Sequence, residues 1–171
     1  MVSIRPILHS QIDELRQISI DTFCASHGHS ANKEDIDIYI RYAYAKSKLL
    51  EELEDKNSLF HFIYVNNEIA GYSKLIIDYP YKNLTSANAA KLERIYLLEK
   101  FYSQGLGQQL FDFNIAKVIE LSQDELWLYT WTENKQAIQF YKKNGLKIID
   151  SADFKISSRH SNPNFIMQLK F

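Results

Sequence analysis

"FYSQGLGQQLFDFNIAK", residues 101–117, sets Gly105 and Gly107 in front of what reads as a long amphipathic helix. These are two of only five glycines in the chain of 171 residues, and they follow the β-prone run KLERIYLL at 91–98. A strand, Gly-x-Gly and a helix form a compact anion cradle, because N–H groups at a helix N-terminus are unpaired and the macrodipole favours negative charge there. Glycine also lets the backbone approach a phosphate and adopt positive φ, which we expect at Gly107. The alternative is a tight turn that binds nothing.

The residues around the two glycines narrow the class of phosphate ligand. A Walker loop requires Lys-Ser/Thr after its second glycine, but Gln108 and Gln109 follow Gly107. A Rossmann fingerprint requires a third glycine about where Leu110 stands. Both a nucleoside triphosphatase and a dehydrogenase are therefore disfavoured.

Length and composition predict one globular domain spanning residues 1–171. Hydrophobic residues make up 46% of the chain and aromatic residues 13%, which excludes a disordered class. The net charge of −1 gives no reason to expect nucleic acid or an anionic membrane as partner. The single cysteine, Cys24, cannot form an intramolecular disulfide. With early charges at the N-terminus and no apolar run near membrane-span length, we expect a soluble, cytoplasmic protein.

The alternation of strands and helices predicts a mixed α/β domain around one central sheet. Ser10 and Asp13 have the spacing of a capping box, and Asn134 and Gly145 are the expected caps of a later helix. We expect a loop at 24–32 and a proline-containing connection at 79–90. The predicted strands are 2–7, 58–65, 69–78, 91–98, 125–131, 146–152 and 164–171, and the predicted helices are 9–23, 33–56 (one broken or two short), 106–121 and 134–143.

Two further segments carry candidate functional side chains. In "ENKQAIQFYKKNGL", residues 133–146, Ala137 and Tyr141 are four residues apart and lie on one helix face. In the strand 91–98, Glu93 and Arg94 interrupt an otherwise β-prone run. Each also has a structural interpretation: Tyr141 as a core tyrosine, the helix-starting asparagine as a cap alone, and the charged pair on a solvated edge. In the functional interpretation Glu93 points into a cleft.

Together these segments resemble the GCN5-related N-acetyltransferases (GNAT) over residues 60–148. The family's pyrophosphate loop, R/Q-x-x-G-x-G/A, is matched by residues 102–107, except that Tyr102 replaces the usual Arg or Gln. A narrower resemblance, to bacterial spermidine/spermine N-acetyltransferases of the PaiA type, rests on residues 61–75, 92–110 and 140–146 and on the long helical stretch 33–56. The family's later segment, N-x-x-A-x-x-F/L-Y-x-x-x-G-F/L, is matched by Asn134, Ala137, Phe140, Tyr141, Gly145 and Leu146.

The resemblance implies a GNAT fold, with a mostly antiparallel sheet of about six to seven strands flanked by about four helices. It implies direct acetyl transfer from acetyl-CoA to a small-molecule primary amine, and a homodimer is possible. Glu93 would be the general base and Tyr141 the general acid for the leaving thiolate, while a strand N–H near Ile95 or Leu97 would stabilise the oxyanion. The implied acetyl-CoA-binding residues are Ile95, Tyr96, Leu97, Tyr102, Ser103, Gln104, Gly105, Leu106, Gly107, Gln108, Asn134, Ala137, Tyr141 and Lys143.

The narrower resemblance implies that the acceptor is a polyamine such as spermidine or spermine. A polyamine needs carboxylates for its distal charges and aromatic faces for its methylenes. The alternatives are a protein N-terminus, a lysine, a free amino acid, or a non-catalytic acyl-CoA- or peptide-binding module. The segment 33–55, which resembles the acceptor-side helices of the family, supplies the candidate acceptor residues Glu34, Asp35, Asp37, Glu51 and Glu54, with Tyr39, Tyr42 and Tyr44 between them. The alternative for these acids is a solvated helix face, which is the favoured interpretation for most of them.

A metal site is disfavoured. Cys24, His27 and His29 provide three local ligands, and His160 or His61 would have to complete the set. The spacing lacks the paired, loop-separated form of structural zinc sites. A nucleophilic role for Cys24 is also disfavoured, since no second motif places a base beside it.

Overall fold

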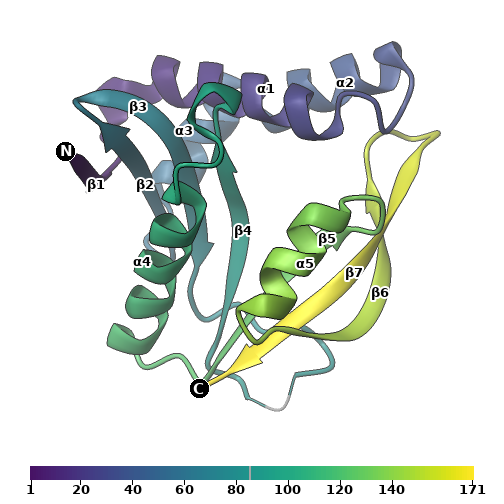
Figure 1. The fold of residues 1–171 in the computed structure, drawn as a ribbon. Coiled ribbons are helices and arrows are strands. Elements are labelled where there is room, and N and C mark those ends of the chain that lie inside the picture. Colours follow the sequence, from purple (N-terminus) through teal and green to yellow (C-terminus); the bar gives the residue numbers. More distant parts are fainter. Residues whose placement is uncertain (85) are drawn as a thin grey trace.

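The computed structural model describes residues 1–84 and 86–171 as one seven-stranded sheet with helices on both faces (Figure 1). The strand order is β1-β2-β3-β4-β5-β7-β6, and every neighbouring pair is antiparallel except β4 and β5. The predicted mixed, mostly antiparallel sheet is therefore confirmed. The strands are β1 Val2–Pro6, β2 Ser58–Val65, β3 Glu68–Ile76, β4 Ala89–Leu97, β5 Glu125–Trp131, β6 Lys147–Lys155 and β7 Ser161–Lys170. The helices are α1 Ile12–His27, α2 Lys33–Ala43, α3 Lys46–Glu54, α4 Leu106–Glu120 and α5 Lys135–Lys143.

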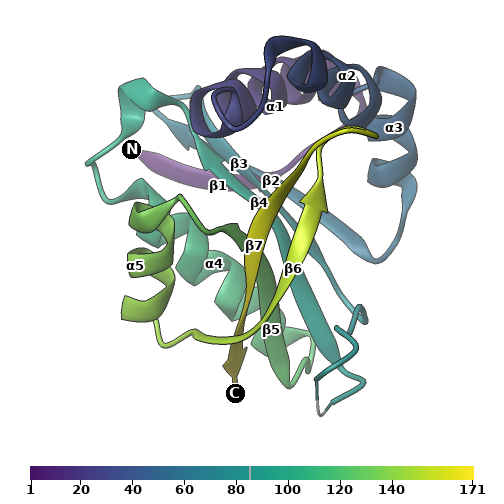
Figure 2. The same cartoon turned by 90° about the vertical axis from the view of Figure 1, so that its right-hand side faces the viewer.

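The helices divide between the two faces of the sheet (Figures 1 and 2). On one face α1, α2 and α3 cover β2 and β3, with Leu15 and Leu49 packed in the same cluster as Phe62. On the other face α4 and α5 bury Phe111 and Tyr141 in a cluster with strand residues. Burial of these apolar stripes against the sheet is the main source of stability for such layers.

β4 and β5 separate shortly after they begin. Their parallel pairing covers only Ala89–Lys91 against Glu125–Trp127. Beyond it, β4 pairs with β3 alone and β5 with β7 alone, so the two strands diverge toward their carboxyl ends (Figure 1). The sheet is therefore split by a V-shaped opening in its middle.

A β-bulge at Glu93 changes which face the later residues of β4 meet. Lys74 pairs with Arg94 and Leu75 with Leu92, which leaves Glu93 as the extra residue. A one-residue insertion reverses the facing of the side chains that follow it. Leu92 accordingly packs with the α4–α5 cluster, whereas Tyr96, an even number of residues later, packs on the α1–α3 side.

Several boundaries differ from the sequence prediction. α1 continues to His27, so residues 24–27 form its last turn rather than a loop. It begins at Ile12 after a 3₁₀ turn, and the expected capping box of Ser10 and Asp13 does not form; instead the Gln11 side chain accepts the Leu8 N–H at 3.2 Å. The stretch 33–56 forms two helices, which makes five α-helices in the described ranges instead of about four. β6 and β7 are also longer than predicted, because their mutual pairing extends to the polar ends of both strands.

The caps predicted for the later helix are confirmed. The Asn134 side chain accepts the Ala137 N–H at 3.1 Å at the start of α5. Gly145 follows the helix with φ of 87°. Separately, none of the helices within residues 1–84 and 86–171 has the length and apolarity needed to cross a membrane.

Gly71 in β3 generates the first prediction. A Cβ there would lie 2.3 Å from the Tyr96 carbonyl oxygen and 3.0 Å from Leu97 Cα. Gly71→Ala should therefore force the β3 and β4 backbones apart and lower the free energy of unfolding by about 1–3 kcal/mol. Thermal and urea denaturation provide the measurement.

Ser73 in the same strand provides the matched control. It is fully buried, and its hydroxyl has no hydrogen-bond partner in the described part of the chain. Ser73→Ala should leave the melting temperature unchanged or raise it. If Gly71→Ala were as stable as the wild type, the close backbone approach would be contradicted.

Candidate functional site

A cavity of about 570 Å³ occupies the opening between β4 and β5. The cradle 102–108 and α5 line one half, and α1, α2 and the ends of β5–β7 line the other. Of the residues predicted to bind acetyl-CoA or to act in catalysis, Gln104 and Lys143 do not line the cavity. Those that line it are Glu93, Ile95, Tyr96, Leu97, Tyr102, Ser103, Gly105, Leu106, Gly107, Gln108, Asn134, Ala137 and Tyr141.

The cradle is built by two positive-φ residues before α4. Ser103 has φ of 61°, and Gly105, the N-cap of α4, has φ of 74°. Gly107 lies inside the first helical turn, so the positive φ expected there is wrong and belongs to Gly105. A Cβ on Gly107 would meet only Leu97 Cδ1, at 3.8 Å. The first N–H groups of α4 have no acceptor within the helix and are available to an anion.

α4 and α5 are tied together beside this cradle. Gln108 Nε2 donates to Asn144 Oδ1 at 2.7 Å, and Asn144 Nδ2 donates to Gln108 Oε1 at 3.2 Å. The side chain of Gln108 is thus engaged, and its backbone N–H is the group left for a ligand. The pair also holds α5, and with it Tyr141, in register with the start of α4.

Tyr141 enters the cavity from the last turn of α5. Its ring packs against Phe111 and Phe140, with centroids 6.1 and 5.5 Å away, and only 9% of the residue is exposed. Burial raises the pKa of the phenol well above its ordinary value. The hydroxyl is therefore protonated at neutral pH.

Glu93 belongs to a chain of ion pairs rather than standing free. Its carboxylate lies 2.5 Å from Lys74 Nζ and 3.2 Å from Lys91 Nζ, and Lys74 also pairs with Glu52 at 3.0 Å. Burial alone would raise the pKa of Glu93, but Lys91, Lys74 and Arg94 outweigh it and lower the pKa to about 2. Both oxygens of this carboxylate are therefore already engaged by ammonium groups of the same chain.

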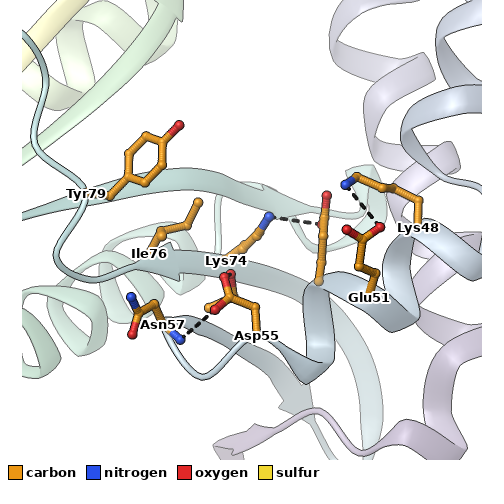
Figure 3. A pocket seen from close by; sticks show the side chains of 9 residues that line it. Lys48, Glu51, Asp55, Asn57, Lys74, Ile76 and Tyr79 are labelled. Carbon is orange, nitrogen blue, oxygen red and sulfur yellow. Dashed lines mark hydrogen bonds and ion pairs between the residues drawn. The ribbon is translucent and has the colours of Figure 1, made fainter.

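The same ion pairs border a second, smaller cleft of about 350 Å³ (Figure 3). Lys74 reaches toward α3 across its floor, and Lys48 pairs with Glu51 at its rim, 3.4 Å apart. Asp55 accepts the Asn57 N–H at 3.0 Å. The cleft is therefore lined by acids that already have partners of the same chain.

The half of the cavity away from the cradle is mainly aromatic. Tyr39 and Tyr44 were predicted from the sequence to lie at the acceptor site, whereas the rings from the other elements were not. The spacing of Phe23 and His27, four residues apart in α1, and the alternation of Tyr129 with Trp131 in β5 were available signals. The side chains that it missed are Phe23, His27, Tyr129, Trp131 and Phe154, with Asn162 and Asn164 beside them.

Most of the acids expected at the acceptor site lie elsewhere. Arg159, at the tip of the β6–β7 hairpin, pairs with Glu34 at 2.9 Å and with Asp35 at 3.0 Å. Asp37 pairs with Lys33, and Glu51 lies in the second cleft. None of the five predicted acids lines the main cavity. Tyr42 is also 74% exposed.

The cysteine–histidine segment does not form a metal centre in the described ranges. No group of three or more His, Cys, Asp or Glu side chains able to hold a metal gathers among residues 1–84 and 86–171. Cys24 is exposed on α1, and the His27 ring stacks on Phe23 with centroids 5.2 Å apart.

Comparison with known proteins places this geometry in context. Residues 12–146 match the sequence profile described as the Acetyltransferase (GNAT) family. An uncharacterized N-acetyltransferase of Lactobacillus delbrueckii subsp. lactis is 35% identical over 145 residues, which cover 85% of this chain and 84% of the relative. The spermidine N(1)-acetyltransferase of Thermoplasma acidophilum is 25% identical over 168 residues, covering 94% and 99%. The crystal structure of the PaiA N-acetyltransferase from Thermoplasma acidophilum in complex with coenzyme A has a TM-score of 0.82 at 24% identity, covering 100% of this chain and 99% of that one.

The cradle generates the second prediction. We expect millimolar coenzyme A to raise the melting temperature of the wild type, since a ligand bound only by the native state stabilises it by mass action. Gly107→Val should keep the fold, because its φ is ordinary and its nearest neighbour is 3.8 Å away, but should abolish the shift by filling the space beside the phosphates. Differential scanning fluorimetry measures both.

Gln109→Val is the matched control, because Gln109 lies on the same helical turn but is exposed and does not line the cavity. It should retain the full shift with coenzyme A. If coenzyme A does not stabilise the wild type, residues 102–108 are not a coenzyme A site. If Gly107→Val keeps the full thermal shift, the phosphates do not bind at this turn.

Proposed function

Because this chain belongs to the GNAT acetyltransferase family, we propose that it transfers the acetyl group of acetyl-CoA to a primary amine in the cavity between β4 and β5. The observation that carries the proposal is the continuity of this cavity. It extends from the phosphate cradle at Gly105, past the unpaired side of β4, to an aromatic chamber on the other side. Donor and acceptor could therefore meet without a covalent enzyme intermediate.

The position of the donor follows from the split in the sheet. Pairing with β5 ends at Lys91, so backbone groups of β4 beyond it that point away from β3 have no strand partner. An extended chain carrying amides, such as the pantetheine arm, would pair with these groups along Ile95–Leu97. Its phosphates would then lie at the start of α4.

The reaction requires a stabilised oxyanion and a protonated leaving group. As the amine attacks, negative charge develops on the thioester oxygen, and an N–H near Ile95 or Leu97 is the proposed donor to it; removal of one such donor costs about 3–4 kcal/mol in other enzymes. As the C–S bond breaks, the thiolate takes a proton. The proposed source is the buried hydroxyl of Tyr141, which the raised pKa keeps protonated.

Tyr141 generates the third prediction. Tyr141→Phe keeps the ring that packs on Phe111 and Phe140 and removes only the hydroxyl. It should lower kcat by roughly 10²-fold or more, the usual contribution of a general acid, while the coenzyme A thermal shift stays unchanged. Steady-state kinetics with acetyl-CoA give the measurement.

Tyr129→Phe is the control, because Tyr129 lines the same cavity from β5 on the aromatic side. It should lower kcat much less. The prediction fails if wild type and Tyr141→Phe have the same kcat and neither shows a pre-steady-state burst, which would indicate rate-limiting product release. Tyr141 would then be a packing residue only.

For the acceptor we propose a polyamine such as spermidine. Similarity to the spermidine N(1)-acetyltransferase of Thermoplasma acidophilum supports it, at 25% identity over 94% of the chain. The aromatic rings of the chamber suit the methylenes of a polyamine and offer cation–π contact to its ammonium groups. Glu93 lies in the lining of the main cavity, and the acids Glu51, Glu52 and Asp55 line the second cleft on the other side of the Lys74 ion pairs.

The fourth prediction compares acceptors. Transfer of labelled acetyl is measured with spermidine, a lysine-containing peptide and a free amino acid, each at several salt concentrations. Spermidine should have a kcat/KM at least roughly tenfold higher than the other two, and its KM should rise as salt screens the distal charges.

A consistent preference for the peptide or the amino acid would discard the polyamine and leave the acetyltransferase standing. If coenzyme A binds but no acceptor is acetylated, the non-catalytic acyl-CoA-binding module becomes the better description.

A further inference from the structure

His27 is a polar group in the aromatic chamber that the chemistry above does not use. It is the last residue of α1 and lines the cavity. Its imidazole stacks on Phe23 at 5.2 Å between centroids, meets Trp131 at 5.7 Å, and faces Tyr96 edge-on at 6.3 Å. Rings from three elements therefore hold it in one orientation.

The hydrogen bonds of Ser26 determine the tautomer of this imidazole. The Ser26 hydroxyl lies 2.8 Å from the Thr22 carbonyl oxygen and 2.7 Å from His27 Nδ1. A hydroxyl has one hydrogen, and a serine at this position of a helix donates it to the carbonyl four residues earlier. The hydroxyl oxygen then accepts from Nδ1–H. The lone pair of the neutral ring is left on Nε2, at the opposite edge.

Nε2 is available to a ligand. The structure gives it no hydrogen-bond partner among residues 1–84 and 86–171, whereas neighbouring Asn162 is already bonded to Ser30 at 2.8 Å and to His160 at 2.9 Å. Burial, with a smaller contribution from His29, lowers the pKa of His27 to about 4, so the ring is neutral at physiological pH. The titratable groups that face it are His29 from the following loop and Tyr96 from β4.

The carboxylate of Glu93, which was predicted to be the general base, has no unengaged oxygen. Glu93 is ion-paired to Lys74 and Lys91, and both of its oxygens are within 3.2 Å of an ammonium group. Protonation of Glu93 would break these pairs. An amine in the chamber would instead meet the unengaged lone pair of His27, which lines the cavity.

We propose that His27 Nε2 accepts a hydrogen bond from the attacking amine and takes its proton during acetyl transfer, a role that rests on the proposed function. The ammonium group of the acceptor first loses a proton to solvent, and the lone pair of the resulting neutral amine forms the C–N bond to the thioester carbon. The C–S bond breaks, its electron pair leaves on sulfur, and the thiolate is protonated by Tyr141. The proton lost by nitrogen moves to Nε2 and then to solvent, while Tyr141 regains a proton from solvent. The products are the N-acetyl amine and free coenzyme A.

The test uses His27→Phe, which keeps a ring for stacking on Phe23 and Trp131 but has no acceptor. The assay is acetyl transfer to whichever of spermidine, the lysine peptide or the amino acid gives the highest kcat/KM with the wild type. His27→Phe should lower kcat roughly 10²-fold, with an unchanged coenzyme A thermal shift. His27→Gln, whose amide can accept the hydrogen bond but not the proton, should recover the KM for the amine and not kcat.

His29→Phe is the matched control, because His29 also contacts Trp131, at 5.3 Å, but does not line the cavity. It should stay within about twofold of the wild type, the effect expected for a surface substitution. The inference is overturned if His27→Phe keeps the wild-type kcat, if His29→Phe loses as much, or if Glu93→Gln alone abolishes transfer. If the wild type acetylates none of the three acceptors, both the proposed function and the role of His27 are overturned. If the wild type and His27→Phe are equally active, only the role of His27 is overturned.

Discussion

The parallel pairing of β4 with β5 ends after three residues, and the rest of the site depends on that interruption. Two strands that stayed paired would close the sheet and leave no cavity. Because pairing stops at Lys91, the later backbone of β4 is free of β5, and side chains from both faces of the sheet border one opening. The bulge at Glu93 adds to this by reversing which face the following residues meet.

The width of this opening is fixed by contacts at both of its ends. At the closed end the strands hydrogen-bond directly. At the open end the β6–β7 hairpin reaches across to α2, where Arg159 pairs with Asp35, a carboxylate whose side chain is 3% exposed (Figure 2). Asp35 is one of the acids predicted from the sequence to bind the acceptor. Its partner shows instead that it helps to hold the two halves of the fold at a fixed separation.

Charge and proton chemistry are separated inside the cavity. Glu93, Lys74, Glu52 and Arg94 neutralise one another in a buried network beside the bulge, where breaking any pair would leave an uncompensated charge. The groups left with exchangeable protons or free lone pairs, Tyr141 and His27, lie among aromatic rings. Such surroundings favour the neutral form of each, which is the form required by the proposed roles of Tyr141 as proton donor and His27 as proton acceptor.

The sequence by itself determined the elements and the cradle. Runs of β-prone residues located the seven strands that the structure describes. The Gly-x-Gly turn, Asn134 and Gly145 are local signals whose meaning depends on neighbouring backbone alone. Only the tertiary structure decided which strands separate, which residue is bulged, and that the last turn of α1 brings His27 to the cavity. These are long-range outcomes, because register and ion pairing depend on partners tens of residues away. From the sequence alone Glu93 was predicted to be a general base, because its ion pair with Lys74 on the adjacent strand forms only in the folded chain.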